Sequence, residues 1–182
     1  MGNWPASPNN GDTTTNELGT QFQYSSSRGA WMITYQTIGN PSYGECYVST
    51  PASTTLTTQS TYYLLAGTTT AGTYLQDFTH ASPGRLTYTG GTTKKFQVLG
   101  ALGVQVPSAS ETYVARVAKN GATIVASTVG IQLSSSGQRP CLVIQTVIEL
   151  ATNDYIEIYV ACITRASTSI QANFGNLIAH SV

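Results

Sequence analysis

Apolar and polar residues alternate with a period of two over most of the C-terminal two thirds of the chain, which predicts β-strands rather than helices. The runs are rich in β-branched and aromatic residues, as strands are. No segment has a convincing helical period. The pattern predicts strands near residues 61–66, 74–80, 85–89, 93–106, 112–119, 122–128, 141–150, 154–164 and 169–180.

The first part of the chain has a different pattern. Two short apolar-polar runs, 21–24 and 30–37, flank the loop 25–29, which predicts a β-hairpin. Residues 39–60 are rich in Thr, Ser, Gly and Pro and predict a linker. The predicted organisation is therefore an N-terminal hairpin unit at 1–38, a linker at 39–60 and an all-β domain at 61–182.

Two turns are marked by their residues. Asn120-Gly121 supplies the positive φ angles of a two-residue type I′ hairpin. The segment 152–154 predicts a second tight connection between two long strands.

Two of the predicted strands are apolar on both sides. One side of 142–150 carries Val143 and Val147, and one side of 154–164 carries Tyr155, Tyr159 and Ile163. The outer side of an antiparallel sheet is usually polar, so these side chains are covered either by another part of the chain or by another subunit. We favour a subunit contact and predict that these five residues form it.

The segments 112–121 and 148–158 resemble the jelly roll of the tumour-necrosis-factor and complement-globular-head type. In that family a Lys-Asn-Gly hairpin, here Lys119-Asn120-Gly121, recurs with a strand pair like Leu150…Asp154-Tyr155-Ile156-Glu157. The resemblance covers roughly 61–182 and implies a jelly-roll β-sandwich that assembles as a homotrimer. Jelly rolls of this type that carry a segment like 85–90 resemble virion proteins of tailed bacteriophages. The pattern of residues 4–31 is also similar to virion proteins of these phages. No site residue carries over, because these folds share architecture and not a common site.

The composition of the chain argues against two classes of function, nucleic-acid binding and membrane insertion. Charged residues make up 9% of the 182 residues, against roughly 25% in an average soluble domain, and the formal net charge is zero. Hydroxyls replace the charges, with 28 Thr and 18 Ser. The lack of a basic excess argues against nucleic-acid binding, and no apolar run approaches the ~20 residues that span a bilayer. No secretory signal is visible at the N-terminus.

The sequence offers no catalytic, metal-binding or cofactor-binding pattern. His80 and His180 stand alone, and no nucleophile elbow occurs. Glu149, Asp154 and Glu157 flank one turn, for which a solvated turn is a simpler explanation than a calcium site. Cys46, Cys141 and Cys162 have no pairing or metal spacing and are expected to be free thiols, which suits synthesis in the reducing cytoplasm of a bacterial host.

We therefore expect a non-enzymatic virion protein: a homotrimer that decorates and cements the head of a tailed bacteriophage, with the major capsid protein or other virion proteins as partners. The N-terminal unit is the expected capsid-contacting arm, anchored by Trp4, Phe22, Tyr24 and Trp31. One alternative is a tail-fibre or receptor-binding head that recognises host surface glycans. A further alternative is a cellular lectin-like or cytokine-like binding module.

Overall fold

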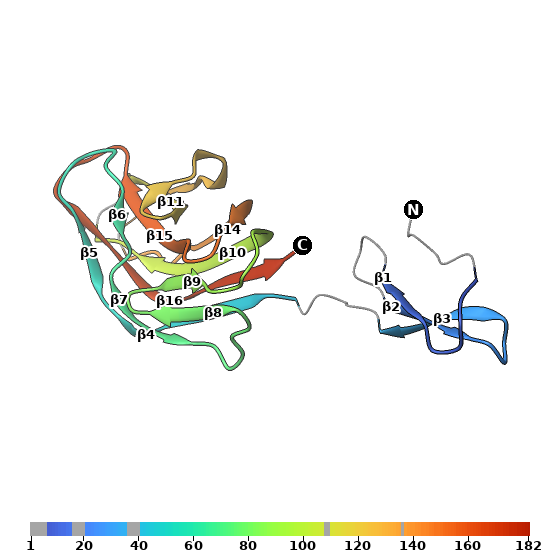
Figure 1. Cartoon of the computed structure of the whole chain (residues 1–182). Coiled ribbons are helices and arrows are strands. Elements are labelled where there is room, and N and C mark those ends of the chain that lie inside the picture. Colours follow the sequence, from blue (N-terminus) through green and yellow to red (C-terminus); the bar gives the residue numbers. More distant parts are fainter. Residues whose placement is uncertain (1–6, 16–20, 36–40, 108–109, 136) are drawn as a thin grey trace. The chain divides into compact units, whose positions relative to one another are not determined.

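A computed structural model describes residues 7–15, 21–35, 41–107, 110–135 and 137–182. The chain divides into two compact units, Met1–Asn40 and Pro41–Val182. Within the described residues the secondary structure consists of strands and one short 3-10 helix, η1 (Val125–Ser127) (Figure 1). No described helix has the length and apolar character needed to cross a membrane.

The N-terminal unit contains one three-stranded antiparallel sheet in the order β1-β2-β3. The predicted hairpin is present as β2 (Gln21–Ser25) and β3 (Ala30–Tyr35), and β1 (Thr13–Thr15) adds a third strand. Phe22 lies opposite Ile33 and Tyr24 lies opposite Trp31, so these four side chains share one face of the sheet.

The second unit is built from two antiparallel sheets, named here after their central strands. The strands of the β10 sheet, in spatial order, are β14 (Cys141–Leu150), β10 (Lys94–Gln105), β16 (Thr168–Ser181), β4 (Tyr43–Pro51) and β7 (Gly67–Ala71), with β5 (Ser53–Leu56) paired to β16. Those of the β11 sheet are β12 (Ala122–Thr123), β11 (Thr112–Lys119), β15 (Tyr155–Cys162), β9 (Arg85–Tyr88) and β8 (Phe78–Ala81), with β13 (Val129–Gln132) paired to β11 and β6 (Tyr63–Leu64) paired to β15.

The connections between the sheets are those of a jelly roll. Starting at β9, the chain passes to β10 in the other sheet, returns to β11, and crosses again from β13 to β14, from β14 to β15 and from β15 to β16. The last strand, β16, lies between β10 and the early strand β4. The predicted fold class, an all-β jelly-roll sandwich preceded by a small β-hairpin unit, is confirmed.

The core lies between the two sheets and is filled by one side of each long strand. The β14 side that begins with Leu142 and the β15 side that begins with Ile156 both belong to it. The rings of Phe78, Tyr88 and Phe96 pack edge-on or tilted against one another, with centroids 5.0–5.4 Å apart. Both predicted turns have the positive φ angles expected of tight turns. In the β11–β12 turn Asn120 and Gly121 have φ angles of 52° and 79°, and in the β14–β15 turn Asn153 has a φ of 71°.

The predicted linker at 39–60 is wrong for residues 43–51 and 53–56, which form β4 and β5 in the β10 sheet. In β5 the side chains of Thr54 and Leu56 are buried and those of Ser53 and Thr55 are exposed. This is the alternation of a half-buried strand in which most of the residues are Thr or Ser. The hydroxyl-rich composition conceals this strand, because Thr and Ser are common both in linkers and at half-buried strand positions.

Three other segments differ from the prediction. The predicted strand at 122–128 is the short β12 followed by η1, and β13 comes after it. Of the predicted strand at 74–80, only 78–80 are in a strand, β8 (Phe78–Ala81). The strand β7 was not predicted, because Gly67 and the following threonines are typical of a turn.

Candidate functional site

The outer face of the β10 sheet is unusually apolar. Val147, Phe174 and Val143 are 60%, 59% and 56% exposed, although all three lie inside regular strands. We use the name "apolar face" for the outward side chains of Tyr47, Leu99, Val143, Val147, Phe174 and Ile178. An exposed apolar surface on a sheet is typical of a protein contact.

The strand register makes these side chains neighbours. Val143 on β14 is aligned with Ala101 on β10, then with Asn176 on β16 and Tyr47 on β4. The next row of the same face contains Leu99 and Ile178. The apolar face therefore reaches across four strands, with the polar residues Asn176, Gln145 and Glu45 at aligned positions between or beside its apolar side chains, and β14 is its edge strand.

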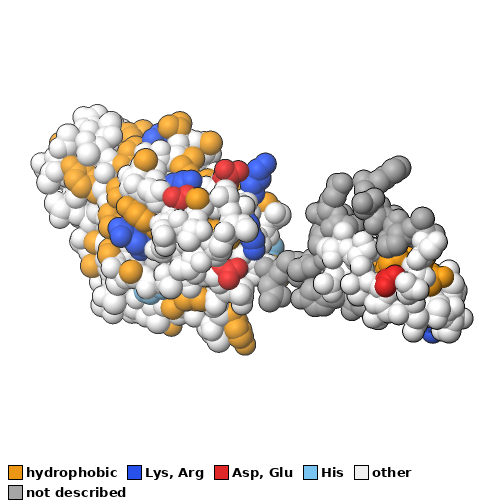
Figure 2. Space-filling model, viewed as in Figure 1, with side chains coloured by type: hydrophobic (Ala, Val, Ile, Leu, Met, Phe, Trp, Pro, Cys, Tyr) orange, Lys and Arg blue, Asp and Glu red, His pale blue; other side chains and the backbone are white. Residues whose placement is uncertain are grey.

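One glycine shapes this face. Gly103 is aligned with Phe174, and a Cβ added at Gly103 would collide with the Phe174 ring. The absence of a side chain at Gly103 lets the ring lie against the β10 backbone, where a β-bulge also shifts the register. In the space-filling view, hydrophobic side chains are spread over the visible side of the larger unit, and its few charged side chains lie among them (Figure 2).

The five residues predicted to form one subunit contact lie on two different faces. Val143 and Val147 belong to the apolar face, whereas Tyr155, Tyr159 and Ile163 belong to, or directly follow, the outward side of β15 in the β11 sheet. The sequence grouped them because β14 and β15 follow one another, but that connection crosses from one sheet to the other. Tyr47, Leu99, Phe174 and Ile178 were missed; the signal for Phe174 is a large aromatic residue facing a glycine across the sheet.

The outer face of the β11 sheet is organised around Glu157. Its neighbours in sequence, Ile156 and Ile158, belong to the core, so the Glu157 side chain lies on the outer side of β15. Even so, its side chain is only 1% exposed. Oε1 accepts a hydrogen bond from Arg85 Nε at 2.8 Å, while Oε2 is inaccessible and has no partner among the described residues. A buried acceptor without a donor costs about 1–3 kcal/mol.

Two arginine–tyrosine stacks flank the carboxylate. The Arg85 guanidinium lies 3.9 Å from the centre of the Tyr155 ring, and that of Arg116 lies 4.3 Å from the Tyr62 ring. The hydrogen bond to Glu157 is the main cause of a raised pKa at Arg85. Burial, followed by the charge of Glu157, raises the pKa of the Tyr159 hydroxyl. We use the name "Arg/Tyr cluster" for Tyr62, Arg85, Arg116, Tyr155, Glu157 and Tyr159.

The turn beside this cluster is held by charge. Asp154 accepts a 2.6 Å hydrogen bond from Asn120 and pairs with Lys119 Nζ at 2.7 Å. Burial raises the pKa of the Asp154 carboxyl, but hydrogen bonds from Lys119, Asn120 and the Ala151 backbone outweigh it and lower the pKa to about 2. The contacts from Lys119 and Asn120 hold the β11–β12 turn against the β14–β15 turn, and the contact from Ala151 lies within the β14–β15 turn.

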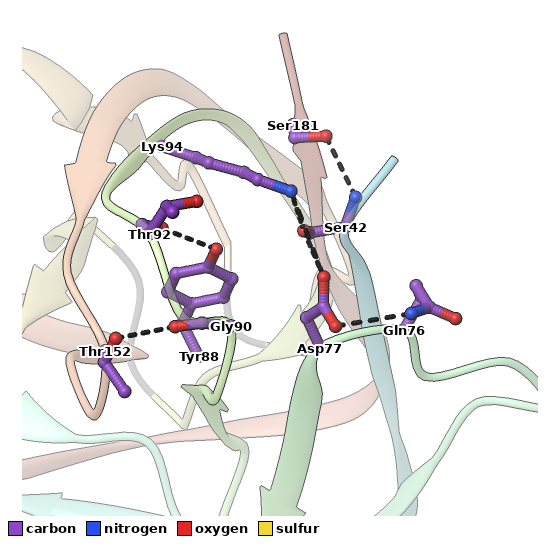
Figure 3. Close-up of polar contacts among 9 residues, drawn as sticks. All are labelled: Ser42, Gln76, Asp77, Tyr88, Gly90, Thr92, Lys94, Thr152 and Ser181. Carbon is purple, nitrogen blue, oxygen red and sulfur yellow. Dashed lines mark hydrogen bonds and ion pairs between the residues drawn. The ribbon is translucent and has the colours of Figure 1, made fainter. Parts of the chain in front are cut away.

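A polar clamp joins the beginning and end of the jelly-roll unit. Lys94 Nζ donates to Ser42 Oγ at 2.8 Å, and Ser42 Oγ donates to Asp77 at 2.7 Å (Figure 3). The Ser42 backbone N–H also donates to Ser181 Oγ. A lysine beside a serine can activate it as a nucleophile, but Ser42 is fully buried and its hydroxyl proton is directed at Asp77. The geometry fits a clamp between strands.

The other residues considered for chemistry lie apart from one another. His80 contacts Thr69 Oγ1 at 2.8 Å, and burial lowers its pKa, whereas His180 is exposed on β16. Glu149 lies on the outer side of β14, and Asp154 and Glu157 have the separate partners described above. The described residues contain no group of three or more potential metal ligands. All three cysteines are free, and burial is the main reason why the Cys46 thiol has a pKa of about 12.

The predicted arm residues are brought together in part. Tyr24 and Trp31 stack with ring centres 5.5 Å apart, and Phe22 is on the same face of the sheet. Ile33 adds a fourth apolar side chain to that face and is 60% exposed. Trp4 lies outside the described residues.

No protein-family model matches the chain, and no curated protein matches it. Among solved structures, it is similar to the PRD1 vertex protein P5, with 15% identity, a TM-score of 0.48, and coverage of 78% of this chain and 96% of that one. It is also similar to an exo-β-1,3-galactanase from Phanerochaete chrysosporium solved with galactose, at 13% identity and a TM-score of 0.32. That match covers 87% of this chain but only 32% of the galactanase. Likenesses at these levels assign no function.

Proposed function

We propose that this chain is a structural protein of a bacteriophage virion, which forms a homotrimer through the apolar face and cements the head of a tailed phage. The single observation that carries the assembly step is the set of exposed apolar side chains on four strands of one sheet face, up to the edge strand β14. The strand order of the two sheets and the resemblance of 112–121 and 148–158 to trimeric jelly rolls support the same assembly.

The proposed contact is heterologous. The exposed edge of β14 on one subunit packs against the open part of the apolar face on the next, so that each subunit uses two different surfaces. Contacts of this kind close into a ring when the rotation between subunits closes. A stable interface buries about 800 Å² on each partner. Of the two outer faces of the sandwich, this one combines exposed aliphatic and aromatic side chains with an unpaired strand edge.

The proposed role of the N-terminal unit is to bind the capsid. Phe22, Tyr24, Trp31 and Ile33 share one face of its sheet, and Ile33 on that face is 60% exposed. A small sheet gains stability when such a face is covered. Three arms on one trimer would bind neighbouring capsid subunits with high effective concentration, so that three weak contacts hold the shell together.

The first test is the number of copies of this chain per major capsid protein in purified virions, measured by quantitative mass spectrometry. A ratio approaching one supports the head-cement role. A count of a few trimers per particle would instead support a location in the tail, where the same fold would act as a receptor-binding head. Absence from virions would refute the viral proposal.

The receptor-binding alternative is favoured by one specific observation, the Arg/Tyr cluster on the outer face of the β11 sheet. In the proposed trimer this face is not used for assembly and is free for a ligand.

A further inference from the structure

The Arg/Tyr cluster contains several polar groups that have no hydrogen-bond partner among the described residues. Glu157 Oε2 is a buried acceptor to which no described group donates. Arg85 is bonded to the protein through Nε, and its terminal amino groups have no partner among the described residues although 41% of its side chain is exposed. The hydroxyls of Tyr155 and Tyr159 likewise lack hydrogen-bond partners within the described part of the chain.

These groups converge on one place. Arg85 Nε bonds Glu157 while its guanidinium covers the Tyr155 ring. A Cβ added at Gly121 would lie 3.6 Å from Tyr155 Oη and 3.8 Å from Tyr159 Oη, so both phenols are directed toward the Asn120-Gly121 turn. The small residue Ala118 lies directly opposite Glu157 on β11.

The chemistry of the unpaired groups restricts the ligand. Glu157 Oε2 requires a hydrogen-bond donor, and the Arg85 amino groups require acceptors. The tyrosine hydroxyls can pair with either a donor or an acceptor. A cation would satisfy only the carboxylate, and an anion would satisfy only the guanidinium. Adjacent hydroxyls of a sugar donate and accept at neighbouring atoms, and aromatic edges suit the apolar side of a sugar ring. We propose that the Arg/Tyr cluster is a carbohydrate-binding site for a glycan that presents a vicinal diol.

Entry of the ligand requires a local movement. Glu157 Oε2 is inaccessible, so a hydroxyl reaches it only when a covering side chain shifts. The side chain most able to shift is Arg85, because one hydrogen bond and one ring contact hold it and much of its side chain already faces solvent. Binding should therefore perturb the Arg85 Nε–H signal as well as the two tyrosine rings.

The test is an NMR titration of the full chain, isotope-labelled at tyrosine and arginine. The probes are methyl β-galactoside, methyl α-mannoside, methyl β-glucoside and methyl β-N-acetylglucosaminide, each raised to tens of millimolar because single-sugar contacts are weak. We expect saturable shifts of the Tyr155, Tyr159 and Arg85 signals with at least one probe. The same sugars displayed as immobilised oligosaccharides then distinguish a polymeric cell-surface glycan, which should bind more tightly, from a free sugar.

Three variants decide the assignment. Tyr159→Phe removes one hydroxyl and Arg85→Lys removes the planar fork, and each should weaken binding about tenfold, the usual effect of losing one good hydrogen bond. Tyr74→Phe removes the same hydroxyl from a tyrosine that is 76% exposed in a loop, and should leave binding unchanged. No shift at these signals with any probe, or binding that the first two variants leave intact, would overturn the proposal and assign an internal water to Glu157. Neither result depends on whether the chain is found in virions.

Discussion

The two outer faces of the jelly roll are built by the same strand alternation, yet their apolar residues differ strongly in solvent exposure. On the β10 sheet, Val143 and Val147 are 56% and 60% exposed. On the β11 sheet, the outward residues Ala118 and Ala161 are both 0% exposed. The outer side of the β11 sheet carries long Arg and Tyr side chains beside these small residues, whereas nothing described in the chain covers the valines.

An apolar outward side of a strand can therefore be covered by the chain itself or left open to solvent. In the β11 sheet the chain covers its own second face, with stacked arginine and tyrosine side chains that bury a carboxylate. In the β10 sheet the second face stays open, which is the condition for binding another subunit. Association and ligand binding are thus assigned to different faces of one sandwich, and each assignment can be tested separately.

The largest effect is expected from a charge placed in the apolar face. Val147→Asp would bury three unpaired carboxylates in the proposed trimer, and an unpaired buried charge costs several kcal/mol. We expect monomers at micromolar concentration in size-exclusion chromatography with light scattering. Thr79→Asp, an exposed position on the outer side of the β11 sheet, is the control and should leave the assembly unchanged.

Tyr159→Asp sharpens the same comparison. Tyr159 lies on the β11 sheet, so this variant should remain assembled if the apolar face alone forms the contact. Monomers from Tyr159→Asp together with intact trimers from Val147→Asp would reverse the assignment of the two faces.

The next largest effect concerns the cover of the β11 sheet. Arg85→Ala leaves Glu157 buried without its partner and should lower the free energy of unfolding by about 2–3 kcal/mol at neutral pH, measured by urea denaturation. Glu157→Leu should cost less, about 1 kcal/mol, because the partly exposed Arg85 can turn into solvent.

A smaller effect is expected at the turn beside the cluster. The Asp154 pKa falls from 3.8 to about 2 in the folded chain, so the carboxylate contributes about 2 kcal/mol of stability above pH 4, which is lost as the pH falls toward 2. Asp154→Asn should remove this contribution, so that the stability curves of the two proteins converge near pH 2. Parallel curves across this range would contradict the proposed role.

The smallest effect is expected at the second stack. Arg116→Lys replaces a planar guanidinium over Tyr62 with a compact ammonium and should cost about 0.5–1 kcal/mol in urea denaturation. Arg139→Lys, at an exposed position outside the strands, is the matched control and should be neutral. Equal effects of the two changes would indicate that the stack does not hold the cover in place.

Most of the long strands could be predicted because their alternation is local. The strands near 94–105, 112–119 and 141–150 were predicted almost to their ends, and the Asn120-Gly121 turn was predicted from two residues. The strand β5 was missed although it alternates, because Thr and Ser occupy outward positions that are usually charged. Composition there concealed a period that was present.

The all-β class, the main strands, the hairpin turns and the presence of two-sided strands can be predicted from the sequence, because each depends on residues close together in the chain. The face that each side of a strand occupies depends on the folded arrangement of the two sheets. A jelly roll sends consecutive strands to opposite sheets, so Val147 and Tyr159, twelve positions apart in sequence, lie on different faces. The pairing of Arg85 with Glu157 and of Gly103 with Phe174 joins distant segments, and no local pattern specifies such partners.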